Sequence, residues 1–106
     1  MSCEIKSVGE LLTVILDGEI DHHTAKQMRE QIDEAIEFYM PTLLIMDFGR
    51  VTFMDSSGIG LVMGRYRTLQ KKGAKLNLTN LPPNIYKVMK LAGIERLAKI
   101  EKENAV

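Results

Sequence analysis

Two adjacent serines follow an aspartate and precede a glycine in the segment Asp55-Ser56-Ser57-Gly58. A serine hydroxyl can attack a substrate, accept a phosphoryl group or cap a helix. After this segment, apolar residues recur at the three- and four-residue spacing of a helix packed on one face, at Ile59, Val62, Met63, Tyr66 and Leu69. Ser56 or Ser57 is therefore predicted at a helix N-terminus, where free backbone N–H groups and the helix dipole favour an anion such as phosphate.

Two plainer or competing interpretations apply to the serines. Position alone favours a serine that only caps the helix, which contributes about 1 kcal/mol. A hydrolase would need the G-x-S-x-G elbow, but Met54 stands where the first glycine of an elbow around Ser56 belongs. His22 or His23 would have to serve as base and Asp55 as its orienting acid, in a short chain with little room to bury a substrate. We expect no enzymatic activity.

The glycines after the serines resemble a dinucleotide-binding fingerprint only in part. Gly58, Gly60 and Gly64 are spaced with one residue too many before the last glycine, and the turn contains no lysine for phosphate. Their expected role is to let the backbone of a protein partner approach the serine. Two adjacent histidines and the single Cys3 supply neither a metal site nor a disulfide, and we expect no cofactor.

Composition limits the possible partners. The chain has 106 residues, 45% of them hydrophobic, which suits one domain over residues 1–106. Fourteen basic and fourteen acidic residues cancel, so no overall field attracts nucleic acid or an anionic membrane. No signal-peptide pattern or long apolar segment is present, and we expect a cytoplasmic protein.

The first half of the chain is predicted to form a hairpin, a helix and a buried strand. Residues 3–17 indicate two strands joined by a tight turn at Gly9, and residues 18–21 indicate a loop. Asp21 is placed to cap a helix that ends before Pro41. The predicted buried face of this helix consists of Ala25, Met28, Ile32, Ala35, Ile36 and Tyr39. Residues 42–48 form a continuous apolar run, which predicts a central strand covered on both faces.

The second half alternates helices and strands. Residues 49–54 lead into the serine turn, and the second helix is predicted to reach about Lys72, with Gly73 as its stop. A strand at 75–78, a third helix beginning at the proline pair 82–83 and a short strand at 97–100 follow. The third helix should bury Ile85, Val88, Met89 and Ala92, and end at Gly93. The last six residues are polar and are expected to fray.

These elements predict an α/β fold, a mixed β-sheet with an opening hairpin, then parallel crossovers, with helices packed on it. In such sheets, functional sites gather beyond the carboxyl ends of the strands. Two strand-to-helix loops carry acidic or hydroxyl groups, at residues 18–24 and 54–60. If both loops emerge at one end of the sheet, they form a compact acidic surface around a hydroxyl, made of Glu19, Asp21, Asp55, Ser56 and Ser57.

Three stretches carry a family resemblance, at residues 18–25, 53–60 and 64–66. They read Gly-Glu-Ile-Asp-His-His-Thr-Ala, Phe-Met-Asp-Ser-Ser-Gly-Ile-Gly and Gly-Arg-Tyr. The chain resembles the STAS-domain anti-sigma factor antagonists, and among them the sporulation branch that acts on anti-sigma F factors. The likeness extends over essentially the whole chain in the order and length of its elements.

The resemblance implies a protein that binds an ATP-dependent serine-kinase anti-sigma factor and so releases the sigma factor, its indirect partner. The kinase would phosphorylate the second serine, Ser57, and a PP2C-type phosphatase would restore it. The expected partner-binding residues are Glu19, Asp21, His22, Met54, Asp55, Ser56, Ser57, Gly58, Ile59 and Gly60. The same fold in a different circuit, with a stress-response kinase or a signalling scaffold, is the alternative.

A phosphate on Ser57 adds about −1.5 to −2 charges and three acceptor oxygens. The helix N-terminus accommodates this group, so the domain should stay folded. Beside Asp55 and Asp21, the same charge should weaken partner binding. Phosphorylation is therefore predicted to switch binding off.

Overall fold

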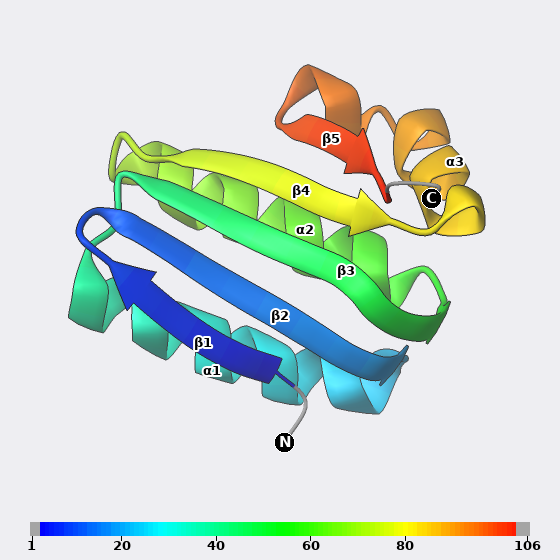
Figure 1. The fold of residues 1–106 in the computed structure, drawn as a ribbon, viewed down its shortest axis with the longest axis horizontal. Coiled ribbons are helices and arrows are strands. Elements are labelled where there is room, and N and C mark those ends of the chain that lie inside the picture. The colour runs from blue at the N-terminus through cyan, green and yellow to red at the C-terminus, as the bar shows by residue number, and fades with distance from the viewer. Residues whose placement is uncertain (1–2, 104–106) are drawn as a thin grey trace.

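The sheet has five strands in the order β1-β2-β3-β4-β5 within residues 3–103, the part of the chain that the computed structural model describes. β1 pairs antiparallel with β2, and every later pair is parallel. The strands are β1 (Cys3–Val8), β2 (Leu11–Ile20), β3 (Leu43–Met54), β4 (Lys75–Leu81) and β5 (Lys99–Lys102). The predicted fold class, an opening hairpin followed by parallel crossovers, is confirmed (Figure 1).

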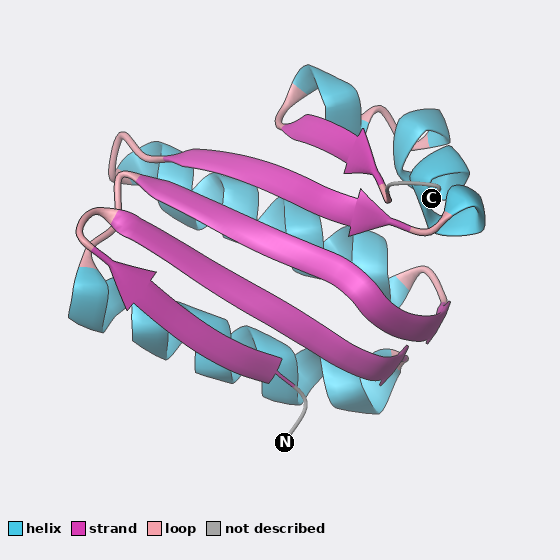
Figure 2. Cartoon of the chain, viewed as in Figure 1, coloured by secondary structure: helices cyan, strands magenta, loops and turns pink. Residues whose placement is uncertain are grey.

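The parallel strands are connected by helices. α1 (His22–Tyr39) joins β2 to β3, α2 (Ser57–Lys71) joins β3 to β4, and α3 (Pro83–Leu91) with the 3-10 turn η1 (Ile94–Arg96) joins β4 to β5. Each crossover moves one strand further in the same direction, so right-handed connections place successive helices on one face. α1 and α2 accordingly lie behind the sheet in Figure 2. None of the helices in residues 3–103 has the length and apolar composition needed to cross a membrane.

The opening hairpin is confirmed, but its second strand is longer than predicted. Gly9 has a positive φ of 59°, which the tight turn requires. Residues 18–20 were predicted as a loop, and that prediction is wrong: they continue β2 and pair with β3. Two irregularities in the pairing and a φ of 87° at Gly18 let the strand continue despite its broken apolar alternation. The pairing carries β2 as far as Ile20.

β3 is also longer than predicted and is covered on one face. Residues 49–54 are part of the strand rather than a lead into the turn. Leu44, Met46 and Phe48 are buried, whereas the alternate residues between them are only half-buried. The predicted coverage on both faces is therefore wrong, because α1 and α2 pack against the same side of the sheet (Figure 2).

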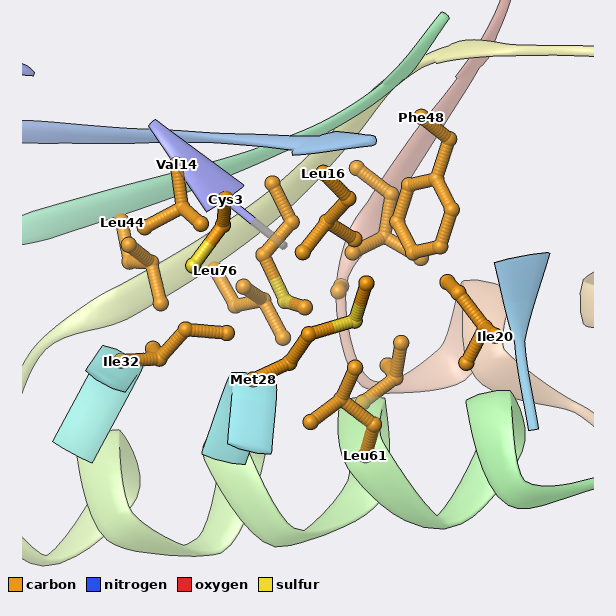
Figure 3. Packing of buried hydrophobic residues seen from close by; sticks show 14 of the residues in the cluster. Cys3, Val14, Leu16, Ile20, Met28, Ile32, Leu44, Phe48, Leu61 and Leu76 are labelled. Atoms are coloured by element: carbon orange, nitrogen blue, oxygen red, sulfur yellow. The ribbon is translucent and has the colours of Figure 1, made fainter. Parts of the chain in front are cut away.

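The core fills the layer between the sheet and these two helices. In Figure 3, Met28 and Ile32 of α1 and Leu61 of α2 point toward sheet residues such as Leu16 and Leu44. Burying each such side chain stabilises the fold by about 1.5–3 kcal/mol. On α1 the predicted buried face is confirmed at four positions, Met28, Ile32, Ala35 and Ile36. Ala25 is half-buried, and Tyr39 is 44% exposed, because α1 ends there beyond the edge of the core.

The C-terminal quarter differs most from the prediction. α3 buries Ile85 and Met89, but Val88 and Ala92 are exposed, so its packed face is narrower than predicted. A 3-10 turn follows Gly93, which shifts the last strand from the predicted 97–100 to Lys99–Lys102. Residues 101 and 102, predicted to fray, therefore lie in a strand, and residues 104–106 lie outside the described part.

Candidate functional site

The carboxyl ends of β2 and β3 lie side by side, which brings the two predicted loops together. Ile20 pairs with Met54 at the end of the parallel ladder. The Asp55 N–H then donates a hydrogen bond of 3.0 Å to the Ile20 carbonyl oxygen. The expectation that both loops emerge at one end of the sheet is thus confirmed (Figure 1).

Asp21 caps α1 as predicted. Its Oδ1 accepts hydrogen bonds of 2.9 Å from the backbone N–H groups of His23 and Thr24. Thr24 completes a capping box, because its Oγ1 accepts from the Asp21 N–H at 2.9 Å and donates to the Glu19 carbonyl oxygen at 2.8 Å. The hydrogen bond from the Thr24 N–H is the main cause that lowers the pKa of Asp21 below its ordinary value of 3.8. His22 and His23 occupy the first turn and are exposed.

The serine hydroxyls do not cap α2. Ser56 occupies the N-cap position with a helical backbone and makes no capping hydrogen bond through its side chain. Asp55 does that work instead: its Oδ1 accepts a hydrogen bond of 2.8 Å from the Ser57 N–H. Ser56 is exposed and Ser57 half-buried, and neither hydroxyl is hydrogen-bonded to any group in residues 3–103. The capping interpretation of the serines is therefore wrong, and both hydroxyls are available.

Met54 and Gly58 lie against each other beside the serines. A Cβ added to Gly58 would overlap the Met54 side chain. The Met54 side chain therefore occupies the space that a larger residue at position 58 would need. Met54 and Ile59 are half-buried, and Gly60 is exposed with open space around it. The geometry thus leaves room for a partner's backbone at Gly60 and not at Gly58.

The geometry gives no support to a serine hydrolase. The Asp55 oxygen that would orient a base accepts from the Ser57 backbone instead. Within residues 3–103, no hydrogen bond links His22 or His23 to Asp55 or to a serine hydroxyl. No three His, Cys, Asp or Glu side chains in the same part of the chain come close enough to hold a metal ion.

A cavity of about 350 Å³ opens between α1 and α2 next to Ser57. We call it the α1–α2 cavity; its polar lining comes from His22, Lys26 and Arg29 of α1 and from Ser57 and Arg65 of α2. The three cationic residues, Lys26, Arg29 and Arg65, were not among the predicted site residues. Their helical spacing from His22 and from Ser57 was the signal available, because it places them on the facing sides of the two helices. The predicted acidic surface therefore borders a basic cavity.

Arg65 is the buried charged residue of α2. Its side chain is 6% exposed, and its Nε lies 2.8 Å from Oδ1 of Asp33 on α1. Burial lowers the pKa of the Arg65 guanidinium, Asp33 opposes this effect, and the positive charges of Arg29 and Arg67 add to it. The predicted apolar stripe of α2 is confirmed at Val62 and Leu69, which are buried. Its centre is shifted toward Leu61 and Arg65, since Ile59, Met63 and Tyr66 are only half-buried.

The fold and the site define a STAS domain, and the chain belongs to that family: the STAS domain model matches residues 2–105. The chain is similar to the anti-sigma F factor antagonist of Lysinibacillus sphaericus, with 39% identity over 80% of this chain and 73% of the relative. It is 33% identical to the anti-sigma F factor antagonist of Paenibacillus polymyxa, over 85% of this chain and 77% of the relative.

Solved structures agree with these sequence matches. The anti-sigma factor antagonist SpoIIAA in its unphosphorylated form is 35% identical, with a TM-score of 0.81 over 95% of this chain and 89% of the other. The Bacillus cell fate determinant SpoIIAA in the phosphorylated form superposes with a TM-score of 0.74 over 95% of this chain and 92% of the other. The predicted resemblance to anti-sigma F factor antagonists is confirmed.

Proposed function

We propose that this domain is an anti-sigma factor antagonist whose binding is switched off by phosphorylation of Ser57. In its unphosphorylated form it binds a cytoplasmic serine-kinase anti-sigma factor with bound ATP, and the sigma factor is released without touching this domain. The supporting observation is the Ser57 hydroxyl at the start of α2, which has no hydrogen bond to residues 3–103, in a chain similar to anti-sigma F factor antagonists. The role is that of a binding regulator of sporulation transcription, not of an enzyme.

The proposed binding surface is the end of the sheet where β2 and β3 finish. Glu19 and His22 are exposed there, and Asp21 and Asp55 add negative charge while they cap the two helices. A basic patch on the partner would complement these carboxylates and speed association. The surface consists of Glu19, Asp21, His22, Met54, Asp55, Ser56, Ser57, Gly58, Ile59 and Gly60. Gly58 is buried and contributes indirectly, because the side chain of Met54 packs against it.

Ser57 suits the role of phosphoacceptor because its hydroxyl is spared from capping. Asp55 supplies the cap, so transfer of a phosphoryl group to Ser57 breaks no hydrogen bond of its side chain within residues 3–103. The N-terminus of α2 then stabilises the added charge. SpoIIAA has been solved in both forms, which supports a reversible modification in this family. A PP2C-type phosphatase would remove the phosphate and restore binding.

The added phosphate weakens binding through charge and bulk at the partner-facing surface. A loss of 1.4 kcal/mol reduces affinity about tenfold, so a few kcal/mol suffices for a switch. A dianion on Ser57 adds bulk at this surface and a strongly hydrated group that must be desolvated when the partner binds, and this cost exceeds any added attraction to a basic patch. The domain itself stays folded.

The test compares Ser57→Ala with its neighbour Ser56→Ala. Each protein is incubated with the kinase anti-sigma factor and ATP, and its intact mass and binding affinity are measured. We expect the mass of Ser56→Ala to rise by one phosphate and that of Ser57→Ala to stay constant. Both variants should bind the kinase while they are unphosphorylated. A phosphate on Ser57→Ala, or equal affinity of phosphorylated and unmodified wild type, would contradict the proposal.

A further inference from the structure

The α1–α2 cavity is lined by positively charged side chains that are not part of the proposed binding surface. Ser57 and three cationic side chains, Lys26, Arg29 and Arg65, line it. Lys26 and Arg29 are exposed and are not in an ion pair with any residue in the described range 3–103. The cavity is thus a positively charged space directly beside the proposed phosphoacceptor.

Arg65, which lines the cavity, has a buried N–H donor without an acceptor in the described residues. Asp33 pairs with its Nε, but Nη1 is buried and has no hydrogen-bond partner in the described residues. A buried N–H group without a partner has lost its hydrogen bonds to water and has gained none in the protein, which destabilises the fold. The nearby charges of Arg29 and Arg67 also lower the pKa of Arg65. An anion in the cavity would lie beside the Arg65 guanidinium and relieve this repulsion.

The helix geometry also favours an anion at this place. His22 is the first residue of α1 and Ser57 the first residue of α2, so the positive ends of both helix dipoles point to the same end of the cavity. The volume of about 350 Å³ is large compared with the roughly 30 Å³ that one water molecule occupies, so a phosphate group fits. Gly60 also lines the cavity, and nothing lies within 4 Å of the position its Cβ would take.

We propose that the α1–α2 cavity receives the phosphate of phosphorylated Ser57, with Lys26, Arg29 and the guanidinium of Arg65 as its donors. This inference rests on the proposed function, which makes Ser57 the phosphorylated residue. Phosphorylation then does more than add charge at the acidic surface: it ties α1 to α2 through the phosphate. The phosphorylated form becomes the more stable fold, held by contacts that the unmodified protein lacks.

The first test measures the second pKa of the phosphate, which is about 6 when unperturbed. Phosphoserine is incorporated at position 57 during synthesis, so no kinase is needed, and the phosphate is titrated by 31P NMR in folded and urea-unfolded protein. Nearby cations should lower the second pKa of the phosphate in the folded protein by roughly one pH unit. The double variant Lys26→Gln/Arg29→Gln should lose most of this difference. The matched control Lys71→Gln/Lys87→Gln removes two exposed lysines outside the cavity and should keep it.

The second test measures the melting temperature of each protein with and without the phosphate. A folded pKa below the unfolded one means that the stabilisation is present above the unfolded pKa and is lost as the pH falls through the folded pKa. The gain in melting temperature on phosphorylation should therefore be larger at about pH 7.5 than at about pH 5. It should shrink in high salt and be smaller in the Lys26→Gln/Arg29→Gln variant than in the lysine control.

The outcomes separate this inference from the proposed function. An unchanged phosphate pKa in Lys26→Gln/Arg29→Gln means that only the helix N-terminus holds the phosphate, and the cavity proposal is then wrong even if the kinase modifies Ser57. A pKa difference that disappears in that variant, in a protein that the kinase does not phosphorylate, leaves the cavity as an anion site and refutes the switch.

Discussion

The Arg65 guanidinium on α2 and the Asp33 carboxylate on α1 lie 2.8 Å apart, measured from Nε to Oδ1, and join the two helices that flank the proposed site. The pair is unequally buried, because the Arg65 side chain is 6% exposed and that of Asp33 40%. Solvent therefore screens Asp33 in part, while Arg65 depends on it as its ionic partner. The pair thus links α1 to α2 through Arg65, a residue that also lines the α1–α2 cavity.

Asp33→Ala should lower the free energy of unfolding by about 1–3 kcal/mol. The loss of a partner from a buried pair costs more than that, but the partial exposure of Asp33 reduces the effect. Urea denaturation at neutral pH measures the change. Glu34→Ala, which removes an exposed carboxylate from the next position of α1, is the control and should stay within about 0.5 kcal/mol of wild type. Equal stability of both variants would show that the pair contributes nothing.

Asp21→Asn separates capping from partner binding. Asparagine caps a helix as well as aspartate, so the free energy of unfolding at neutral pH should change by less than about 0.5 kcal/mol. Affinity for the kinase anti-sigma factor should fall and should become less dependent on salt, because one carboxylate leaves the acidic surface. A binding titration at two salt concentrations is the measurement. Unchanged affinity and salt dependence would reduce Asp21 to a helix cap.

The same variant tests the acid response. The pKa of Asp21 is lowered in the folded protein, chiefly by the hydrogen bond from the Thr24 N–H. Its contribution to stability is therefore fully present above the ordinary pKa of 3.8 and is lost as the pH falls through the lower, folded value. Wild type should lose stability more steeply than Asp21→Asn between about pH 4 and pH 2, in urea denaturation at a series of pH values. If the stability of wild type and of Asp21→Asn fell equally with pH, Asp21 would not be the source of this acid response.

Gly58→Ala and Gly60→Ala should have opposite effects on stability. A methyl group on Gly58 overlaps Met54, so the variant should be destabilised by about 1–3 kcal/mol through overpacking. A methyl group on Gly60 meets open space in a helix, where alanine is favoured by about 0.5–1 kcal/mol. Thermal denaturation of the two variants measures the contrast. Gly60→Ala should also weaken partner binding if the partner's backbone approaches at that position.

Ser57→Asp should mimic the phosphorylated form only in part. The helix dipole stabilises the carboxylate, so the variant should fold. Its single negative charge lacks the second charge and the third acceptor oxygen of a phosphate, so binding should weaken less than in phosphorylated wild type. Titration of Ser57→Asp, Ser57→Ala and phosphorylated wild type against the kinase anti-sigma factor gives the order of their affinities. Wild-type affinity in Ser57→Asp would show that charge at this position does not control binding.

Local patterns predicted the parts of the fold that depend on nearby residues. The cap at Asp21 and the stop at Gly73, with its φ of 72°, follow from single residues and are confirmed. The extension of β2 to Ile20 was missed, because residues 18–20 become a strand only through pairing with β3. Coverage of the sheet on one face was missed for the same reason, since it depends on the direction of successive crossovers and not on the composition of β3.

The candidate site shows the same division. The chain order placed the serines at the start of a helix, and the acidic loops were correctly expected to meet. The sequence did not reveal that Asp55 rather than a serine caps α2, because several oxygens in one turn compete for the same N–H groups. The basic cavity was missed because Lys26 and Arg29 look like ordinary solvent-facing charges until α2 is packed beside α1.

The hydrogen bond from the Asp55 N–H to the Ile20 carbonyl joins two segments that are far apart along the chain. A peptide containing only the serine turn would carry the hydroxyls without the carboxylates of the other loop. During synthesis on the ribosome, the surface cannot assemble until β3 has emerged and paired with β2. A partner that needs both loops therefore does not recognise a nascent chain or a proteolytic fragment that lacks either β2 or β3.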